Sequence, residues 1–477
     1  MLGKTAEEVG RSLATHTLRL AITGLSRSGK TVFTTALVHA LTRSPEHPNL
    51  LPFLDIVGGG RLVDVTIEPL EGFDFFPYAE ELKKLTAWPP RWPEKTTEMS
   101  GLRAKLRYRP KSAMLAKTVG LATLNLEIID YPGEWLLDLS MLGKTFDAWS
   151  RETLALCNSG ARARLSESWL RQLALVESDG AGVDFSKAEA TAQRLGEAYR
   201  AFLKACAAPI PDLKLLQPGR FVCGYVPEDL LFCPLPPESS GAGRGWRGWT
   251  TPKTERQALY RVMERRFERY KAEMIEPFYR KHFARFDRQI VLVDVLTALN
   301  AGHETFYDVR RAMTGLVENY QFGSGLLGKL ASKLGLAKIK IDRVLFAATK
   351  ADHITPAFYG GLRQLLEQMA TEKIGQIRSD GAAVGFEVIA SIKSTRNVTC
   401  DYLGKPLQVL QGSLTESPDI EDIFNPGIIP AYLPGPEDWD NGYITFFEFA
   451  PPRLMDADTL GIPHINVDKA LQFLIGS

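Results

Sequence analysis

Apolar positions near the start of the chain change from a strand-like run to helical spacing. Leu18–Ile22 is short, apolar and β-compatible, which predicts a buried strand. From Thr31 to Leu41 the apolar residues recur three or four positions apart, which predicts a helix. A loop with two glycines lies between them, so the pattern predicts a strand, a glycine loop and a helix in direct succession.

Later apolar runs predict further strands of the same sheet. Leu102–Tyr108 alternates apolar and basic residues, as a half-exposed antiparallel strand does, and is expected to pair with the strand that ends before Asp130. The expected fold class is therefore α/β, with a mixed, mostly parallel sheet flanked by helices. The remaining strands are expected at Thr123–Ile129, Arg288–Leu296, Val344–Ala347 and Phe386–Ala390.

About 150 residues separate Gly133 from the strand that begins at Arg288, and this stretch has helical spacing. Ser186–Cys206 carries one apolar face, and a capping box at Thr254 opens a second helical run. We therefore predict a large helical insertion. The expected ranges are 1–139 for the first part of the core, 140–286 for the insertion and 287–477 for the second part with a C-terminal extension.

The glycine loop has the spacing Gly24-x-x-x-x-Gly29-Lys30-Thr31, the Walker A pattern of phosphate-binding loops. The glycines let backbone N–H groups turn toward phosphate oxygens beside the positive end of the helix. Lys30 is expected to reach the β- and γ-phosphates, and Thr31 to offer its hydroxyl to Mg²⁺. The predicted phosphate contacts are Ser26, Arg27, Ser28, Gly29, Lys30, Thr31 and Val32.

Asp130-Tyr-Pro-Gly133 follows the strand at Thr123–Ile129. An acidic residue at the carboxyl end of a buried strand can hold the hydration shell of Mg²⁺, so Asp130 is a predicted metal residue. A glycine three residues later can donate its N–H to a γ-phosphate and move when that phosphate leaves, so Gly133 is a predicted nucleotide contact.

Base recognition is predicted in the last third of the chain, at Thr349-Lys-Ala-Asp352. Asp352 can accept hydrogen bonds from N1–H and the N2 amino group of guanine, an edge that adenine does not present, and the stem of Lys350 can lie over the purine. Ser391 and Ile392 follow the next strand, where the N–H of Ile392 can meet guanine O6.

In this order the motifs resemble those of the Ras-like GTPases, although Thr349 stands where most members have Asn, a replacement that also occurs in the Rho branch. More closely, the chain resembles the YcjX family of bacterial stress-associated GTPases. The resemblance is carried by Gly24–Thr31, Asp130–Trp135 and Ala347–Asp352. It implies a Ras-like core, GTP or GDP as ligand, Mg²⁺ as cofactor and an unknown protein effector.

Several positions in the glycine loop and the expected switch regions leave alternatives open. Glu134 stands where Ras-like enzymes usually have a glutamine that orients water, so hydrolysis is expected to be slow or to use another residue; Glu134 is either catalytic or a surface or hinge residue. Arg91 is either an internal arginine finger or a solvated loop residue. Arg27 can touch phosphate or pair with Glu134. Thr96 and Thr97 are the candidate switch I ligands of Mg²⁺.

Composition narrows the remaining classes. The 477 residues carry 57 Lys and Arg against 56 Asp and Glu, a net charge of +1, so no nucleic-acid partner is predicted. Five scattered cysteines without a C-x-x-C pair, no apolar run that spans a bilayer and no signal peptide favour the cytoplasm. The basic amphipathic segment 326–340 leaves peripheral contact with the inner membrane or an acidic partner open, beside an ordinary surface helix.

The leading hypothesis is a GTP-hydrolysing switch with slow intrinsic turnover. A P-loop kinase or ATPase is the first alternative, but it leaves Thr349–Asp352 without a role. A nucleotide-bound scaffold with negligible hydrolysis is the second, and Glu134 is the residue that favours it.

Overall fold

The computed structural model describes residues 15–94, 98–112, 116, 120–176, 185–236, 253–318, 341–379, 381–442, 444–454 and 461–476. The chain divides into two compact units. Unit 1 comprises Met1–Gly133, Arg285–His303 and Lys340–Ser477, and unit 2 comprises Glu134–Ala284 and Glu304–Ile339. Glu304–Ile339, which the sequence analysis assigned to the C-terminal core range, is thus grouped with the helices of unit 2.

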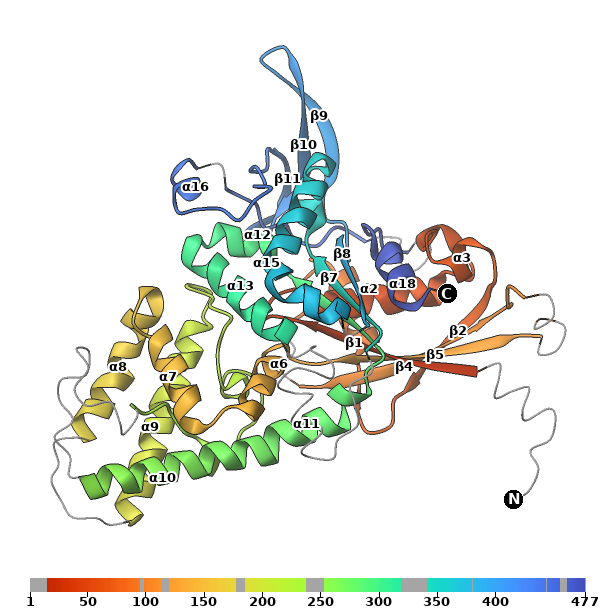
Figure 1. Ribbon diagram of the computed structural model, residues 1–477. Helices are drawn as coiled ribbons and strands as arrows, with labels where there is room; N and C mark the ends of the chain where they lie inside the picture. Colours follow the sequence, from red (N-terminus) through yellow and green to blue (C-terminus); the bar gives the residue numbers. More distant parts are fainter. Residues whose placement is uncertain are drawn as a thin grey trace, which may run out of the picture. The chain divides into compact units, whose positions relative to one another are not determined.

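Unit 1 is built on an eight-stranded sheet with the order β2-β4-β5-β1-β6-β7-β8 and β3 beside β4 (Figure 1). The neighbours from β5 to β8 pair in parallel, whereas β4 is antiparallel to β5 and β2. The predicted mixed, mostly parallel sheet is therefore confirmed. The strands are β1 (Thr15–Gly24), β2 (Leu62–Pro69), β3 (Asp74–Phe75), β4 (Ser100–Tyr108), β5 (Ala122–Asp130), β6 (Arg288–Val293), β7 (Arg343–Ala348) and β8 (Ala383–Val388).

Helices α2 and α18 share one apolar core with the strands of this sheet. Phe33, Leu37 and Leu41 of α2 and Leu471 and Leu474 of α18 are fully buried in it. This burial fixes the start of α2, where the glycine loop ends. The described helices of unit 1 are α2 (Lys30–Arg43), η1 (Pro48–Leu50), α3 (Asp55–Gly58), α4 (Tyr78–Thr86), α12 (Val295–Asn300), η7 (Ala351–His353), η8 (Pro356–Phe358), α15 (Tyr359–Ser379), α16 (Glu437–Asp440) and α18 (Val467–Ile475).

One predicted strand ends earlier than expected. The apolar run from Arg288 to Leu296 suggested a single strand, but β6 ends at Val293. Asp294 caps the N-terminus of α12, since its carboxylate accepts a hydrogen bond from the N–H of Thr297 at 3.0 Å. The apolar residues Val295 and Leu296 therefore belong to a helix.

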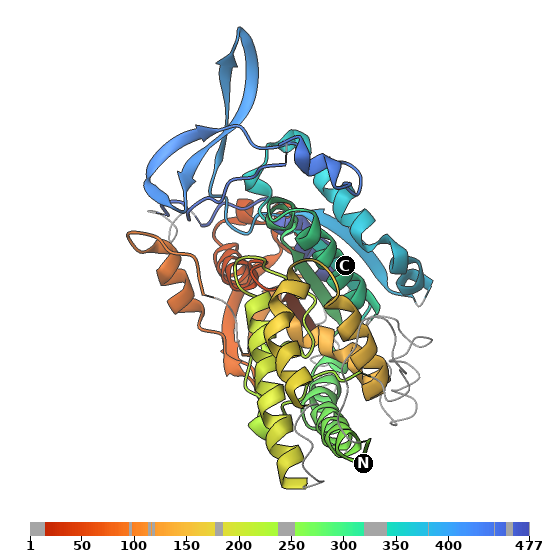
Figure 2. The ribbon, with the colours of Figure 1, turned by 90° about the vertical axis from the view of Figure 1, so that its left-hand side faces the viewer.

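A second, three-stranded antiparallel sheet in unit 1 has the order β11-β10-β9. Its strands are β9 (Arg396–Tyr402), β10 (Lys405–Leu414) and β11 (Ser417–Phe424), and the β9–β10 hairpin projects from the rest of the unit in both side views (Figures 1 and 2). Cys400 lies on β9 and is half-buried, whereas the other four cysteines are buried.

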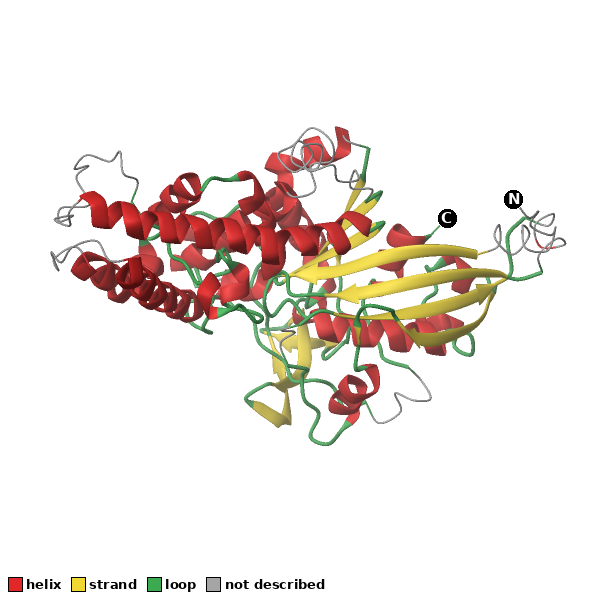
Figure 3. Cartoon of the chain, turned by 90° about the horizontal axis from the view of Figure 1, so that it is seen from below, coloured by secondary structure: helices red, strands yellow, loops and turns green. Residues whose placement is uncertain are grey.

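The described part of unit 2 consists of helices and loops (Figure 3). The predicted helical insertion is confirmed, and its core is a cluster of aromatic rings that includes Trp149, Trp169, Tyr199, Phe232 and Phe267. The helices are α6 (Glu134–Leu139), η2 (Ser140–Gly143), α7 (Phe146–Leu156), α8 (Gly160–Val176), α9 (Phe185–Cys206), η3 (Gly219–Phe221), η4 (Glu228–Leu230), α10 (Lys253–Tyr270), the π-helical η5 (Lys271–Ile275) and α11 (Glu276–Lys281), together with most of α13 (His303–Glu318). The short η6 (Phe283–Arg285) ends one residue beyond Ala284.

Asp138 ties α6 into unit 2. Its carboxylate accepts hydrogen bonds from the N–H of Gly219 and the hydroxyl of Tyr270, each at 2.6 Å. Burial raises the pKa of Asp138 to about 6, although these donors and the nearby guanidinium of Arg220 act in the opposite direction. Among the described residues, no helix is both long enough and apolar enough to cross a membrane.

Candidate functional site

The glycine loop between β1 and α2 holds Lys30 in a buried position. Gly29 has φ 84°, a left-handed conformation that glycine adopts at little cost, and Arg27 shares this region with φ 65°. The Lys30 ammonium donates a hydrogen bond to the carbonyl oxygen of Gly24 at 2.9 Å. The loop therefore curls around its own lysine and leads into the N-terminus of α2, a position that favours an anion.

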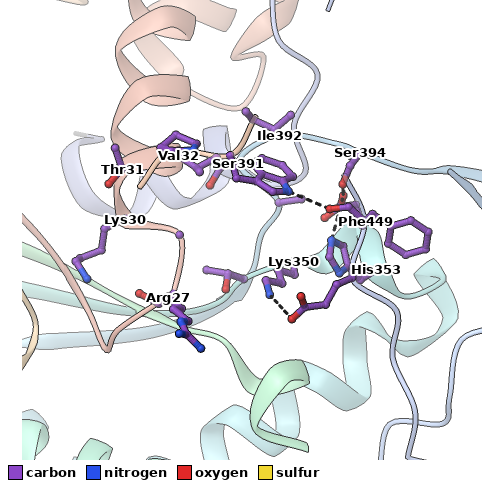
Figure 4. A pocket seen from close by; sticks show the side chains of 18 of the residues that line it. Arg27, Lys30, Thr31, Val32, Lys350, His353, Ser391, Ile392, Ser394 and Phe449 are labelled. Atoms are coloured by element: carbon purple, nitrogen blue, oxygen red, sulfur yellow. Dashed lines mark hydrogen bonds and ion pairs between the residues drawn. The ribbon is translucent and has the colours of Figure 1, made fainter. Parts of the chain in front are cut away.

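A cavity of about 410 Å³ opens beside this loop, within unit 1 (Figure 4). It extends to the carboxyl ends of β7 and β8, where the base was predicted to bind. Of the predicted nucleotide contacts, ten line it, whereas Ser26 and Gly133 do not. The ten are Arg27, Ser28, Gly29, Lys30, Thr31, Val32, Lys350, Asp352, Ser391 and Ile392.

Asp352 is oriented by Ser394, a residue that sequence reasoning missed. Oδ2 of Asp352 accepts hydrogen bonds from the backbone N–H of Ser394 at 2.8 Å and from its hydroxyl. Asp352 is almost fully buried, yet each carboxylate oxygen can accept two hydrogen bonds, so acceptor capacity remains for a base. The motif after β8 pointed to Ser391, so the contact of Ser394 with Asp352 becomes visible only in the fold.

Lys350 is fixed by two residues at the start of α12. Its ammonium lies 2.7 Å from Oδ2 of Asp294 and donates to the hydroxyl of Thr297 at 3.0 Å. Burial alone would lower the pKa of Lys350, but Asp294 outweighs it and the pKa lies above its usual value. The aliphatic stem is thereby held along the cavity wall, as the predicted contact with a purine requires.

The C-terminal part of unit 1 forms a wall of the cavity that the sequence analysis did not predict. The backbone carbonyl of Phe449 accepts a hydrogen bond from the indole N–H of Trp92 at 3.0 Å. The ring of Phe449 meets that of His353 edge to face, with centroids 5.0 Å apart. The lining residues missed at the sequence level are Trp92, Pro93, Glu94, His353, Ala390, Ser394, Thr415, Glu448 and Phe449.

Gly133 lies directly against the glycine loop. A Cβ atom at this position would overlap the carbonyl oxygen of Gly24, so only glycine fits without a shift of the backbone. Asp130, at the end of β5, pairs with Ile22 of β1 and is buried. The hydroxyl of Thr31 and the carboxylate of Asp130 are hard oxygen donors that suit Mg²⁺ with water in its remaining positions. Thr96 and Thr97 lie outside the described residues.

Two further predicted residues lie away from the cavity lining. Arg91 is exposed, and its backbone N–H donates to the carbonyl of Lys84 at 3.0 Å. Glu134 is the first residue of α6 in unit 2 and is buried, so the surface alternative is wrong for this side chain. Its catalytic and hinge alternatives stay predictions. The basic segment 326–340 lies outside the described residues.

Comparison with known proteins gives one consistent result. The model of the YcjX-like family, DUF463, matches residues 18–477. A protein of Escherichia coli (strain K12) named Ras-like GTPase YcjX is 36% identical, over 98% of this chain and 97% of its own length. A protein of the same name from Shewanella oneidensis (strain MR-1) is 34% identical, over 96% of this chain and 94% of its own length.

Proposed function

Because the chain belongs to the YcjX-like family, whose curated relatives are named Ras-like GTPases, we propose that it binds GTP and GDP and hydrolyses GTP as a molecular switch. One observation carries the proposal. A single cavity joins the Walker A loop at Lys30 to the oriented carboxylate of Asp352. A phosphate site and a base site in one cavity suit a nucleotide better than they suit a simple anion.

The base end of the cavity favours guanine. Asp352 offers acceptors, which complement the N1–H and N2 amino group of guanine. Adenine presents an acceptor at N1 and no amino group at C2, so the buried carboxylate would face a lone pair. In a P-loop kinase or ATPase that binds an adenine nucleotide, the carboxylate of Asp352 would find no donor at N1 or C2 of the base.

The phosphate end supports nucleotide-dependent switching. Lys30 would exchange the neutral carbonyl of Gly24 for charged phosphate oxygens, which are stronger acceptors. Mg²⁺, held through Thr31 and Asp130, would neutralise phosphate charge. The N–H of Gly133 would then join the γ-phosphate, and its packing on Gly24 supports this role. Thr96 or Thr97 would complete the metal site in the triphosphate state.

Turnover is proposed to be slow. Ras-like enzymes usually orient the attacking water with a glutamine. Glu134 is a poor substitute, because a carboxylate is repelled by the γ-phosphate. Arg91 is a poor substitute as well, because it is exposed and does not line the cavity. The same observation favours the second candidate, a nucleotide-bound scaffold with negligible hydrolysis. Stress association, the protein effector and membrane contact through 326–340 remain parts of the proposal that rest on the sequence.

Two measurements test the proposal. Calorimetric titration should show GDP bound at least about 100-fold more tightly than ADP, the discrimination expected when a buried polar group is left unpaired by the wrong base. Equal affinities would refute the choice of guanine. Single-turnover hydrolysis of GTP with Mg²⁺ then separates the two candidates. Phosphate release above the buffer rate, and its loss in Lys30→Ala, supports the switch; release at the buffer rate in the wild type supports the scaffold.

A further inference from the structure

Residues 87–94, the described stretch that follows α4 and is called the loop below, place Trp92 in the wall of the cavity. The contacts that hold this loop come from the opposite end of the chain. The indole N–H of Trp92 donates to the carbonyl of Phe449 at 3.0 Å. The guanidinium of Arg453 lies 4.2 Å from the ring centroid of Trp88, within cation–π distance. The segment Phe449–Arg453 thus contacts both tryptophans of the loop.

The segment that provides these contacts is itself firmly placed. Phe449 is 1% exposed, and its backbone forms a β-bridge with Leu414 of the three-stranded sheet. The next residue, Ala450, donates its N–H to the carbonyl of Ser413 at 2.8 Å. The carbonyl that receives Trp92 is therefore on a segment that is hydrogen-bonded to the end of β10, and motion between the two partners would come from the loop.

The loop side is less embedded. Trp88 is 62% exposed and Arg91 is exposed, whereas Trp92 is half-buried against an apolar cluster. That cluster contains Ile392, which follows β8, and Val32 of α2 packs against it as well. Trp92 thus lies between the two ends of the predicted nucleotide site, and its neighbours Pro93 and Glu94 also line the cavity.

We infer that the C-terminal segment Phe449–Arg453 is a clasp that holds the loop over the nucleotide cavity, so that Trp92 and Arg453 act as positioning residues and set how fast a bound guanine nucleotide leaves. The inference rests on the proposed function for the identity of the ligand. Its physical basis is that Trp92, Pro93 and Glu94 form one wall of the cavity, so opening the loop removes that wall.

Trp92→Phe is the sharpest test, because it removes the N–H donor and keeps an aromatic ring. Protein loaded with a fluorescent N-methylanthraniloyl GDP is mixed with excess GDP, and the rate of fluorescence loss gives the dissociation rate. One neutral hydrogen bond is worth about 1 kcal/mol, so release should be about fivefold faster. Arg453→Leu lies outside the cavity lining and should also accelerate release, which separates the clasp from a direct ring–base contact.

Trp439→Phe is the matched control. Trp439 also donates its indole N–H to a backbone carbonyl in unit 1, that of Leu299 at 2.8 Å, but it does not line the cavity. Loss of the hydrogen bond from Trp439 to Leu299 should leave the dissociation rate of the fluorescent GDP unchanged. Unchanged release in both Trp92→Phe and Arg453→Leu overturns the clasp, and so does equal acceleration in all three variants.

Hydrogen–deuterium exchange of the nucleotide-free proteins tests whether the clasp holds the loop, independently of which ligand the cavity binds. Peptides that cover residues 87–94 should exchange faster in Trp92→Phe and Arg453→Leu than in the wild type and Trp439→Phe. A wild type that binds no guanine nucleotide refutes the proposed function, while the exchange data still decide whether the clasp holds the loop. Equal exchange in all four proteins refutes the clasp even if GDP binds.

Discussion

Asp352→Asn should convert the base site from guanine to xanthine. In the wild type Oδ2 is directed by the N–H and hydroxyl of Ser394, and the side chain is 3% exposed, so it has little freedom to rotate. The asparagine oxygen can take over the bond from the Ser394 N–H, since that donor needs an acceptor. The amide nitrogen is then left facing the base, where guanine presents donors and xanthine presents a carbonyl at C2.

The size of the effect follows from the bonds exchanged. Guanine loses two hydrogen bonds to a carboxylate, each worth about 1.5–3 kcal/mol, and meets a donor in their place. The loss of about 3–6 kcal/mol corresponds to a Kd for GDP that rises by a factor of about 10² to 10⁴. Xanthosine diphosphate gains one bond to the amide and should bind the variant more tightly than GDP does.

Isothermal titration of wild type and variant with GDP and xanthosine diphosphate measures this exchange. Asp342→Asn is the control, because Asp342 forms an exposed ion pair with Arg288 and does not line the cavity. Ser394→Ala should weaken GDP binding by about tenfold without any gain for xanthine, since it removes one orienting bond and no acceptor. The reasoning is refuted if Asp352→Asn keeps the wild-type affinity for GDP, or if it loses GDP without gaining xanthosine diphosphate.

Three further predictions concern the phosphate end, the Lys350 pair and unit 2. Gly133→Ala should slow single-turnover GTP hydrolysis by at least about tenfold, because the new methyl group overlaps Gly24; wild-type turnover would contradict the role of Gly133. Asp294→Asn should lower the free energy of unfolding in urea by about 1–3 kcal/mol and weaken GDP binding, since the Lys350 ammonium loses its counter-charge; unchanged values would show that the pair has no such role. Asp138 has a pKa of about 6 in the folded chain, above the ordinary value of 3.8 expected in the unfolded chain, so the folded state keeps its proton to higher pH. The free energy of unfolding should therefore fall by about 1 kcal/mol from pH 5 to pH 7. Asp138→Asn should lack that share of the pH dependence; an identical slope in wild type and variant would exclude Asp138 as its source.

Local patterns predicted the main sheet and the helix after the glycine loop well. Apolar periodicity located β1, α2, β4 and β5 to within a few residues, because each element has its own signal in a short window. The end of β6 was misplaced because Val295 and Leu296 continue an apolar run, and the cap at Asp294 has no distinct apolar signature.

The missed parts of the site depend on long-range pairing. Ser394 meets Asp352 across 42 positions of sequence, and Trp92 meets Phe449 across 357. No spacing rule connects such residues, since only the closed fold brings them together. The candidate site was therefore predictable where one motif supplies the contact, and unpredictable where two distant segments share it.

The position of Cys400 makes the chain suitable for a spectroscopic reporter without any added cysteine. Burial raises the pKa of Cys157 to about 11 and that of Cys206 to about 12, which keeps these thiols protonated and poorly reactive. Cys400 is half-buried on β9, the strand that begins two residues after Ser394. A dye attached there through a maleimide would sit on the same stretch of backbone that holds Asp352. The projecting hairpin thus offers a labelling position in the native sequence, on the strand that follows Ser394.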